Sequence, residues 1–378
     1  MGEFLPYARQ TITEDDIQAV VDVLRSDWLT TGPAVEAFEH AIAGYTGSTH
    51  AVAVSSGTAA LHAMMNAIGI GPGDEVIVPA MTFVATANAV VYCGGTPVFA
   101  DVDADTLLID VESVAACITP RTRAIIAVDY AGQPCDYDAL AALAAAHGIR
   151  LLSDGCHALG GTYRGRQVGT LAELTAFSFH PVKHVTTAEG GMVTTSDEAL
   201  AQRMREFRNH GIAKDHWQRE NTGTWEYQMR TLGFNYRLND LQCALGVSQL
   251  RSLPRWLERR RRLASVYDAA LADAPHVVPL ARASSREHAY HLYVVQFGDE
   301  GGTARAEAFA RLRAAEIRAN VHYLPVHLHP FYRETFGTQP GTCPNAERAY
   351  DRILSLPMYP SMRDEDVARV TDVLLQRG

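Results

Sequence analysis

The sequence contains very little lysine. Of its 33 Lys and Arg residues, only two are Lys, at Lys183 and Lys214. Arginine supplies charge but does not act as a nucleophile, because its guanidinium group stays protonated. A chain that uses Arg almost throughout keeps a primary amine at few positions, and such an amine can serve as a Schiff-base lysine. A surface Lys in an Arg-rich chain explains this feature equally well when it is taken alone.

The chain also has no excess of positive charge. Its formal net charge is −10, which argues against DNA or RNA as the main partner because phosphate contacts need a basic surface. Residues 259–262 form a run of four arginines. Their acidic and apolar neighbours indicate a solvated helix face instead of a nucleic-acid site.

The sequence also lacks the features that would indicate a membrane protein, a secreted protein or a zinc site. The sequence has no apolar run of membrane-spanning length, and residues 1–6 lack the basic start and apolar core of a secretory signal. Six cysteines are scattered without close pairs, a pattern typical of reduced thiols and not of a disulfide framework or a zinc site. We therefore expect a cytoplasmic protein with no membrane association and no bound metal.

What the chain does contain indicates an α/β fold. With 378 residues it exceeds one small core, and 47% hydrophobic and 20% charged residues are typical of a soluble globular protein. Short apolar segments alternate with helical ones through the first two thirds, which predicts a mainly parallel sheet covered on both faces. The expected strands are 50–54, 75–79, 96–100, 123–128, 149–153, 175–179 and 192–195, and the expected helices are 13–26, 58–68 and 82–91. Thr13 and Asp16 are spaced as a capping box for the first of these helices.

The pattern changes after about residue 236. A long helical stretch, 239–272, is expected to be interrupted near Pro254, because proline breaks the helical hydrogen-bond pattern. A strand at 291–297, a helix at 304–315 and a terminal helix from Asp364 follow. The sequence thus predicts a large domain over residues 1–250 and a smaller C-terminal α/β domain over residues 251–378.

Several polar residues stand at predicted strand ends, where parallel sheets bind ligands. Lys183 lies in a Gly-flanked loop after the strand 175–179, as a Schiff-base lysine would. Asp154 ends another strand and can pair with a protonated ring nitrogen of a cofactor. His157 follows about one turn later and could bind the same ligand. Taken alone, a strand-end Asp that caps a turn and a structural His are the ordinary interpretations.

Small residues precede the predicted helix 58–68. Gly57, Thr58 and Ala59 would let backbone amides approach an anion at a helix N-terminus. Ser178 could bind the same phosphate, and Phe83 could stack on a flat ring. Individually, a helix cap, a strand hydroxyl bonded to nearby backbone and core packing would account for them. Together they provide an amine, a ring-nitrogen partner, a stacking ring and a phosphate cradle, which matches pyridoxal 5′-phosphate (PLP).

These motifs resemble the DegT/DnrJ/StrS family of sugar-nucleotide aminotransferases, which are fold-type-I PLP enzymes. The resemblance covers essentially the whole chain, and its matching segments are 28–33, 56–61, 82–88, 177–183, 189–191, 235–240 and 321–325. It implies a large domain with a central, mainly parallel sheet and a smaller C-terminal α/β domain. It also implies a cytoplasmic homodimer with shared active sites.

The resemblance implies a role for each matching residue. Lys183 would hold the cofactor as a Schiff base and then move a proton, Asp154 would bind the pyridine nitrogen, and His157 would bind the phenolic side. Phe83 would stack on the ring, and Asn235 would reach the phosphate of the neighbouring subunit. The phosphate would be held by Gly57, Thr58, Ala59 and Ser178. The sugar-nucleotide site would be lined by Tyr7, Trp28, Leu29, Thr30, Ser56, His322, Tyr323 and Pro325.

Within the family, the chain is most similar to the pseudaminic-acid branch, which makes UDP-4-amino-4,6-dideoxy-N-acetyl-β-L-altrosamine. The similarity rests on segments 6–10, 128–132 and 153–160, including His157 where most relatives carry Gln. The implied reaction takes the amino group of L-glutamate to C4 of the UDP-linked 4-keto-6-deoxy sugar. A GDP- or dTDP-linked keto sugar aminated at C3 or C4 is an alternative, and a non-catalytic PLP-binding regulator is another. A PLP-dependent sugar dehydratase of the family would lack Lys183.

Overall fold

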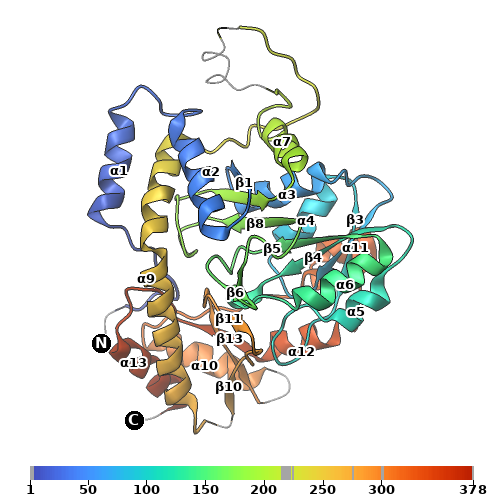
Figure 1. Ribbon diagram of the computed structural model, residues 1–378. Coiled ribbons are helices and arrows are strands. Elements are labelled where there is room, and N and C mark those ends of the chain that lie inside the picture. The colour runs from blue at the N-terminus through green and yellow to red at the C-terminus, as the bar shows by residue number, and fades with distance from the viewer. Residues whose placement is uncertain (1–3, 214–222, 224, 275, 299–301, 377–378) are drawn as a thin grey trace.

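The computed structural model describes residues 4–213, 223, 225–274, 276–298 and 302–376. A seven-stranded sheet forms its centre, in the order β1-β9-β8-β5-β4-β2-β3 (Figure 1). The strands are β1 (His50–Val54), β2 (Glu75–Pro79), β3 (Thr96–Ala100), β4 (Thr122–Val128), β5 (Arg150–Asp154), β8 (Leu174–Ser178) and β9 (Gly191–Thr195). β9 is antiparallel to both of its neighbours, and the other pairs are parallel. The predicted α/β fold with a mainly parallel sheet is confirmed.

The strands are short apolar runs because helices cover both faces of the sheet. All five residues of β2 are buried, as expected for a strand without a solvent-exposed face. The covering helices are α3 (Gly57–Ala67), α4 (Val84–Tyr92), α5 (Val111–Cys117), α6 (Tyr137–His147) and α7 (Glu198–Phe207). Each predicted strand and helix of this region is found within two residues of its expected bounds.

The helix α1 (Glu14–Leu24) begins with the predicted capping box. The Thr13 N–H donates to Asp16 Oδ2 at 2.8 Å, and the Asp16 N–H donates to Thr13 Oγ1 at 3.3 Å. The next helix, α2 (Pro33–Thr46), was not predicted. It starts with proline directly after Gly32, a position where proline fits because the first helical N–H has no partner in the helix.

One continuous helix, α9 (Asp240–Leu271), replaces the interrupted helix that the sequence predicts. It runs through Pro254, which removes one backbone N–H donor. Burial of Leu253 and Trp256 on either side anchors the helix across this point. Figure 1 shows α1 and α2 beside one half of α9, and α13 (Asp364–Leu375) beside the other half. The proposed boundary at residue 250 therefore falls inside a helix that both parts share.

The C-terminal part has a small sheet and a core of its own. Its sheet is antiparallel and consists of β10 (Val277–Pro279), β12 (Tyr293–Phe297) and β13 (Ile353–Leu356). Its core includes Leu263, Val295 and Leu354, together with Leu5 from the other end of the chain. The remaining elements are α10 (Thr303–Ala314), α11 (Pro330–Phe336), α12 (Pro344–Arg352), β6 (Thr162–Tyr163), β7 (Arg166–Gln167), β11 (Arg286–Glu287), η1 (Tyr130–Gly132) and η2 (Val326–Leu328).

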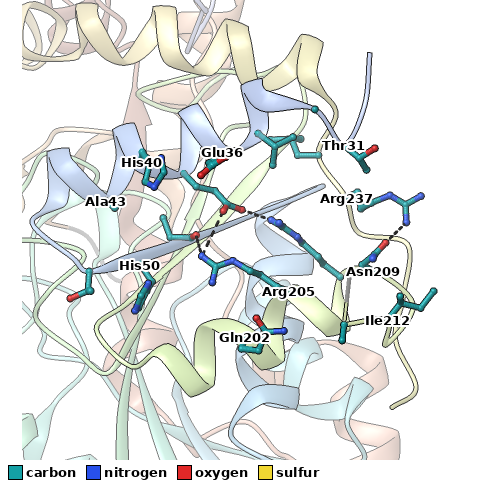
Figure 2. Close-up of a pocket in the computed structure, with 18 residues that line it drawn as sticks. Thr31, Glu36, His40, Ala43, His50, Gln202, Arg205, Asn209, Ile212 and Arg237 are labelled. Carbon is teal, nitrogen blue, oxygen red and sulfur yellow. Dashed lines mark hydrogen bonds and ion pairs between the residues drawn. The ribbon is translucent and has the colours of Figure 1, made fainter. Parts of the chain in front are cut away.

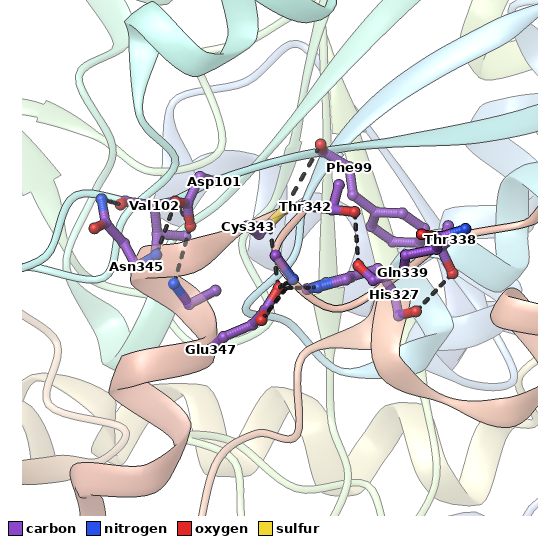
Figure 3. Close-up of polar contacts among 12 residues, drawn as sticks. Phe99, Asp101, Val102, His327, Thr338, Gln339, Thr342, Cys343, Asn345 and Glu347 are labelled. Atoms are coloured by element: carbon purple, nitrogen blue, oxygen red, sulfur yellow. Dashed lines mark hydrogen bonds and ion pairs between the residues drawn. The ribbon is translucent and has the colours of Figure 1, made fainter. Parts of the chain in front are cut away.

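Polar contacts fasten α12 and η2 to the large sheet (Figure 3). Asp101, just after β3, accepts the backbone N–H groups of Asn345 and Ala346 at 2.8 and 2.9 Å. Glu347 of α12 contacts His327 Nε2 of η2 at 2.8 Å. Because η2 directly follows residues 322–325, these contacts also fix the end of that predicted substrate segment.

Candidate active site

Lys183 lies beside the ends of two neighbouring parallel strands. β5 ends at Asp154 and β8 ends at Ser178, and Asp154 is in register with Ala176. Lys183 sits in the loop that follows β8, where its backbone N–H donates to His180 O at 2.9 Å. Burial lowers the pKa of the Lys183 amine, and the nearby Cys156 and Asp154 oppose this shift. The strand ends thus bring the predicted amine and the predicted carboxylate together.

The Asp154 carboxylate is buried and held by two hydrogen bonds. Thr86 Oγ1 on α4 donates to Asp154 Oδ2 at 2.7 Å, and Thr82 contacts Thr86 at 2.8 Å. The backbone N–H of Cys156 donates to the other oxygen at 3.2 Å. The carboxylate is therefore fixed in orientation by neighbouring elements and is not free to turn away from Lys183.

The His157 imidazole is buried and has one unused nitrogen. Its Nε2 lies 3.1 Å from the Tyr323 hydroxyl, and its Nδ1 has no hydrogen-bond partner within the described part of the chain. Burial lowers the pKa of His157 well below its usual value, and Lys183, His322 and His184 lower it further. A neutral imidazole with a buried unpaired nitrogen is suited to a ligand, because buried polar atoms in folded proteins normally have a partner.

The start of α3 packs closely against Ser178. A Cβ atom at Gly57 would come within 2.8 Å of Ser178 Cβ, so glycine is required where the helix start meets the strand end. Ser56 caps the helix, and its hydroxyl accepts the Ala59 N–H at 3.0 Å. This leaves the N–H groups of Gly57 and Thr58 as the helix-start donors for an anion, together with the Ser178 hydroxyl.

Aromatic residues from the N-terminal segment and the small domain cover this region. Phe83, at the start of α4, is 54% exposed, and its ring centroid lies 5.9 Å from that of Tyr323. The Tyr7 ring is 5.9 Å from the His322 ring. The N–H of Val326, directly after Pro325, donates to Ala80 O at 2.8 Å. The structure therefore gathers Tyr7, His322, Tyr323, Pro325, Phe83 and His157 at one place.

The other predicted site residues lie near the N-terminus of α9. Leu29 O accepts the Asp240 N–H at 3.1 Å, and Thr30 pairs with Asn239. Trp28 immediately precedes them. Asn235 is exposed and pairs with Asn209. Within the described residues, no hydrogen bond or ring contact joins Leu29, Thr30 or Asn235 to the group around Lys183.

Two histidines of the site were missed in the sequence. The His291 ring centroid lies 4.3 Å from that of His157, and His184 lies 5.7 Å from His291. His184 Nε2 contacts Ala289 O at 2.9 Å. The position of His184 next to Lys183 was the available signal for it. His291 is more than a hundred residues away from Lys183 along the chain, and no spacing rule connects the two.

A second cavity, of about 310 Å³, lies between α2, β1 and α7 (Figure 2). Its buried Glu39 forms an ion pair with Arg208, and Arg205 lies 3.8 Å away. Glu39 also accepts the Ala53 N–H at 2.9 Å, and the Arg205 guanidinium donates to Ala51 O at 3.3 Å. Because β1 is an edge strand, these charges serve the unpaired backbone groups of the sheet edge.

The described residues contain no group of three or more His, Cys, Asp or Glu side chains that could hold a metal ion. In the same part of the chain, no helix combines the length and the apolar character needed to cross a membrane.

The chain is similar to known proteins over almost its whole length. Residues 10–375 match the DegT/DnrJ/EryC1/StrS aminotransferase family. The chain is 43% identical over 376 residues to the spore coat polysaccharide biosynthesis protein SpsC of Bacillus subtilis (strain 168), covering 99% of this chain and 97% of that protein.

Solved structures show the same likeness. One is Helicobacter pylori PseC, described as an aminotransferase involved in the biosynthesis of pseudoaminic acid. It has a TM-score of 0.93 and 34% identity, and the match covers 99% of both chains. Spr1654 of Streptococcus pneumoniae, solved in PLP and PMP forms, has a TM-score of 0.92 and 34% identity over 98% of both chains.

The fold and the site define a fold-type-I aminotransferase. The chain belongs to the DegT/DnrJ/EryC1/StrS aminotransferase family. The predicted enzyme class, a PLP-dependent sugar aminotransferase, is confirmed at the level of this family.

Proposed function

We propose that this chain moves the amino group of L-glutamate to C4 of a UDP-linked 4-keto-6-deoxy-N-acetylhexosamine, with PLP as cofactor. The observation that carries the proposal is the half-buried Lys183 beside Asp154 and beside His157, whose Nδ1 has no partner among the described residues. An amine, a fixed carboxylate and a neutral imidazole at one sheet edge are the groups that PLP chemistry requires.

The residues at the site fit PLP. The Gly57–Ser178 approach, which a Cβ would block, leaves helix-start N–H groups beside a hydroxyl as a phosphate cradle. The Asp154 carboxylate would hold the ring nitrogen, and the free His157 Nδ1 would bind the phenolic oxygen. The exposed Phe83 ring would stack on the cofactor ring.

When bound, PLP supplies a carbonyl carbon that takes up the amine and a ring that withdraws electrons. Lys183 contributes the amine that moves a proton, and burial favours its neutral form, which can accept that proton. Thr86 and the backbone N–H of Cys156 hold the two Asp154 oxygens, so the carboxylate would meet the ring nitrogen in a fixed orientation.

Two observations support a pseudaminic-acid-type substrate. PseC of Helicobacter pylori, described as acting in pseudoaminic acid biosynthesis, superposes over nearly the whole chain. His157 stands where most of the family carries Gln, and the pseudaminic branch resembles this chain in using His. Both observations favour a UDP-linked 4-keto sugar as the acceptor.

A second candidate substrate follows from a different relative. SpsC of Bacillus subtilis is 43% identical to this chain and is a spore coat polysaccharide biosynthesis protein. A GDP- or dTDP-linked keto sugar destined for a polysaccharide is therefore the alternative acceptor. In either case we place the reaction in the cytoplasm, because all six cysteines are free thiols.

The working unit in this proposal is a homodimer in which Asn235 reaches the phosphate region of the partner. Residues 225–234, just before Asn235, expose several large apolar side chains. These are Trp225, Tyr227, Met229, Leu232 and Phe234, with exposed fractions from 40% to 85%. Such a cluster favours burial against another chain. Mixing Lys183→Ala and Asn235→Ala subunits tests it, because shared sites would restore part of the activity that neither variant has alone.

An absorption experiment tests the function itself. The purified protein is loaded with PLP, and its visible band is recorded before and after L-glutamate is added. We expect the visible band to be replaced by a near-UV band. UDP-, dTDP- and GDP-linked 4-keto sugars are then added separately, and the acceptor is the one that restores the visible band. A protein that takes up no PLP would overturn the proposal, and a bound cofactor that ignores glutamate would point to the regulator alternative.

A further inference from the structure

Tyr323 and His157 bring together two segments that lie far apart in the sequence. His157 follows β5 of the large sheet, and Tyr323 belongs to the segment between α10 and η2. The Tyr323 hydroxyl lies 3.1 Å from His157 Nε2, and the two rings are stacked with centroids 6.1 Å apart. The contact therefore joins a cofactor-binding residue to a residue of the predicted substrate segment.

The protonation of this pair follows from its surroundings. A neutral imidazole has one N–H donor and one acceptor nitrogen. His157 is neutral because burial and nearby cations lower its pKa. Burial also raises the pKa of the Tyr323 hydroxyl well above its usual value, so the hydroxyl keeps its proton and can donate.

The distance of 3.1 Å does not by itself say which atom carries the proton. If Nε2 carries it, the Tyr323 oxygen accepts, and Nδ1 presents a lone pair to the ligand. If Nδ1 carries it, Tyr323 donates to Nε2, and Nδ1–H becomes a donor. An anionic phenolic oxygen can be bound only by a donor, so the second tautomer satisfies both ends of the imidazole.

We propose that Tyr323 is a positioning residue that fixes His157 in its Nδ1–H tautomer and thereby presents a hydrogen-bond donor to the phenolic oxygen of the cofactor. The identity of that ligand rests on the proposed function, whereas the tautomer is a property of the cofactor-free protein. The small-domain segment thus controls a cofactor contact without touching the reacting atoms.

The surroundings hold both rings in place for this role. The Tyr323 backbone N–H donates to Met81 Sδ at 3.2 Å, and the Phe83 ring packs against the Tyr323 ring. On the other side, His291 lies against the imidazole with centroids 4.3 Å apart. The groups that lie near His157 are these rings together with Tyr130, Lys183, His322 and His184, and among the described residues no carboxylate is hydrogen-bonded to its Nε2.

The tautomer can be read from ¹⁵N chemical shifts in cofactor-free protein labelled at histidine. The His157 signals are assigned by their loss in His157→Gln. We expect a protonated Nδ1 and an unprotonated Nε2 in the wild type. In Tyr323→Phe we expect the proton to move to Nε2, and the dissociation constant for PLP to rise roughly fivefold, as for the loss of one hydrogen bond.

Tyr130→Phe is the matched control. It removes a different tyrosine hydroxyl, which donates to the backbone oxygen of His322 on the same segment. We expect it to leave the His157 tautomer unchanged.

Two outcomes would overturn the inference, and a third concerns the proposed function alone. A wild-type proton on Nε2 overturns it, even if Tyr323→Phe does not fold. A tautomer shift in Tyr130→Phe as large as that in Tyr323→Phe also overturns it, because loosening of the segment would then be the cause. Failure of the wild type to take up PLP refutes the proposed function alone, since the shifts still report the tautomer.

Discussion

The site around Lys183 and the cavity between α2, β1 and α7 are both polar, but their polar groups are used differently. In the α2–β1–α7 cavity, Glu39, Arg205 and Arg208 pair with one another and with the edge strand. Around Lys183, the His157 and His291 rings each keep a buried Nδ1 without a partner in the described chain. Buried charges that are paired find their partners within the fold. A buried donor or acceptor without a partner costs free energy of desolvation, and a ligand that binds it can offset this cost.

This difference separates a structural polar cluster from a functional one better than size does. The α2–β1–α7 cavity has a volume of about 310 Å³, yet the charges of Glu39, Arg205 and Arg208 are already paired within the protein. The site around Lys183 instead holds the His157 and His291 nitrogens that have no partner among the described residues. Substitutions at four residues test whether the two polar clusters differ in this way.

Replacing Lys183 should abolish turnover. We expect Lys183→Ala to lower kcat at least about 10⁴-fold, because the amine that holds the cofactor and moves the proton is gone. Lys183→Arg is the control, since it keeps a positive charge without a usable amine, and it should be as inactive. Circular dichroism should show an intact fold for both. Retained activity in either variant would remove Lys183 from the reaction.

Replacing Asp154 should slow the reaction and spare cofactor binding. We expect Asp154→Asn to lower kcat roughly 10²-fold or more, because a fixed charge at the ring nitrogen is lost. The matched strand-end carboxylate is Asp101 after β3, which caps α12. Asp101→Asn should lower the melting temperature and leave kcat unchanged. Equal rates for Asp154→Asn and the wild type would refute the assigned role.

Replacing Glu39 should lower the stability of the protein and leave kcat unchanged. Glu39→Gln leaves Arg208 without its buried partner, so we expect unfolding to become easier by about 3 kcal/mol with kcat unchanged. Glu36→Gln, an exposed residue in the wall of the same cavity, should change stability by less than about 0.5 kcal/mol. Denaturant unfolding of the cofactor-free protein measures both. A loss of activity in Glu39→Gln would indicate that the cavity is functional after all.

Acid should destabilise the Lys183 site through its histidines. Burial, and then Lys183, lowers the pKa of His322 to about 4. The folded protein thus keeps His322 neutral while the unfolded chain binds a proton below about pH 6.5, so stability falls as the pH drops from about 6.5 to about 4. At about pH 5 the loss from this residue is about 2 kcal/mol. His322→Gln should reduce the gap between the melting temperatures at neutral and acid pH; an unchanged gap contradicts the shift.

Much of the part built on the seven-stranded sheet could be predicted, because short stretches of sequence determine its strands and helices. Short apolar strands and the Thr13–Asp16 capping box are readable over a few residues, and Asp154, His157 and Lys183 each follow a recognisable strand. The sequence did not predict that α9 continues through Pro254, because the packing of Leu253 and Trp256 overrides the local effect of proline. The helix α2 was also not predicted, although Val35, Phe38 and Ile42 follow helical spacing after Gly32 and Pro33.

The site could be predicted only where the sequence places its residues next to a strand end. His291 reaches the site through tertiary contacts, and nothing in its own sequence neighbourhood marks it. Ser56 shows a further limit. The helix cap that its local motif favours is present, because its hydroxyl accepts the Ala59 N–H, and its contact with a substrate stays a prediction. A local sequence pattern identifies candidate site residues, whereas tertiary packing determines which side chains and backbone groups they contact.

The continuity of α9 also limits how the enzyme can move. A helix of 32 residues spans about 48 Å and resists bending, and this one packs on α1 and α2 at one end and on α13 at the other. A rotation of the small part as a rigid body would have to bend α9, and the weakest point is Pro254, where one helical hydrogen bond is missing. A movement that leaves α9 straight is therefore confined to shorter segments of the chain.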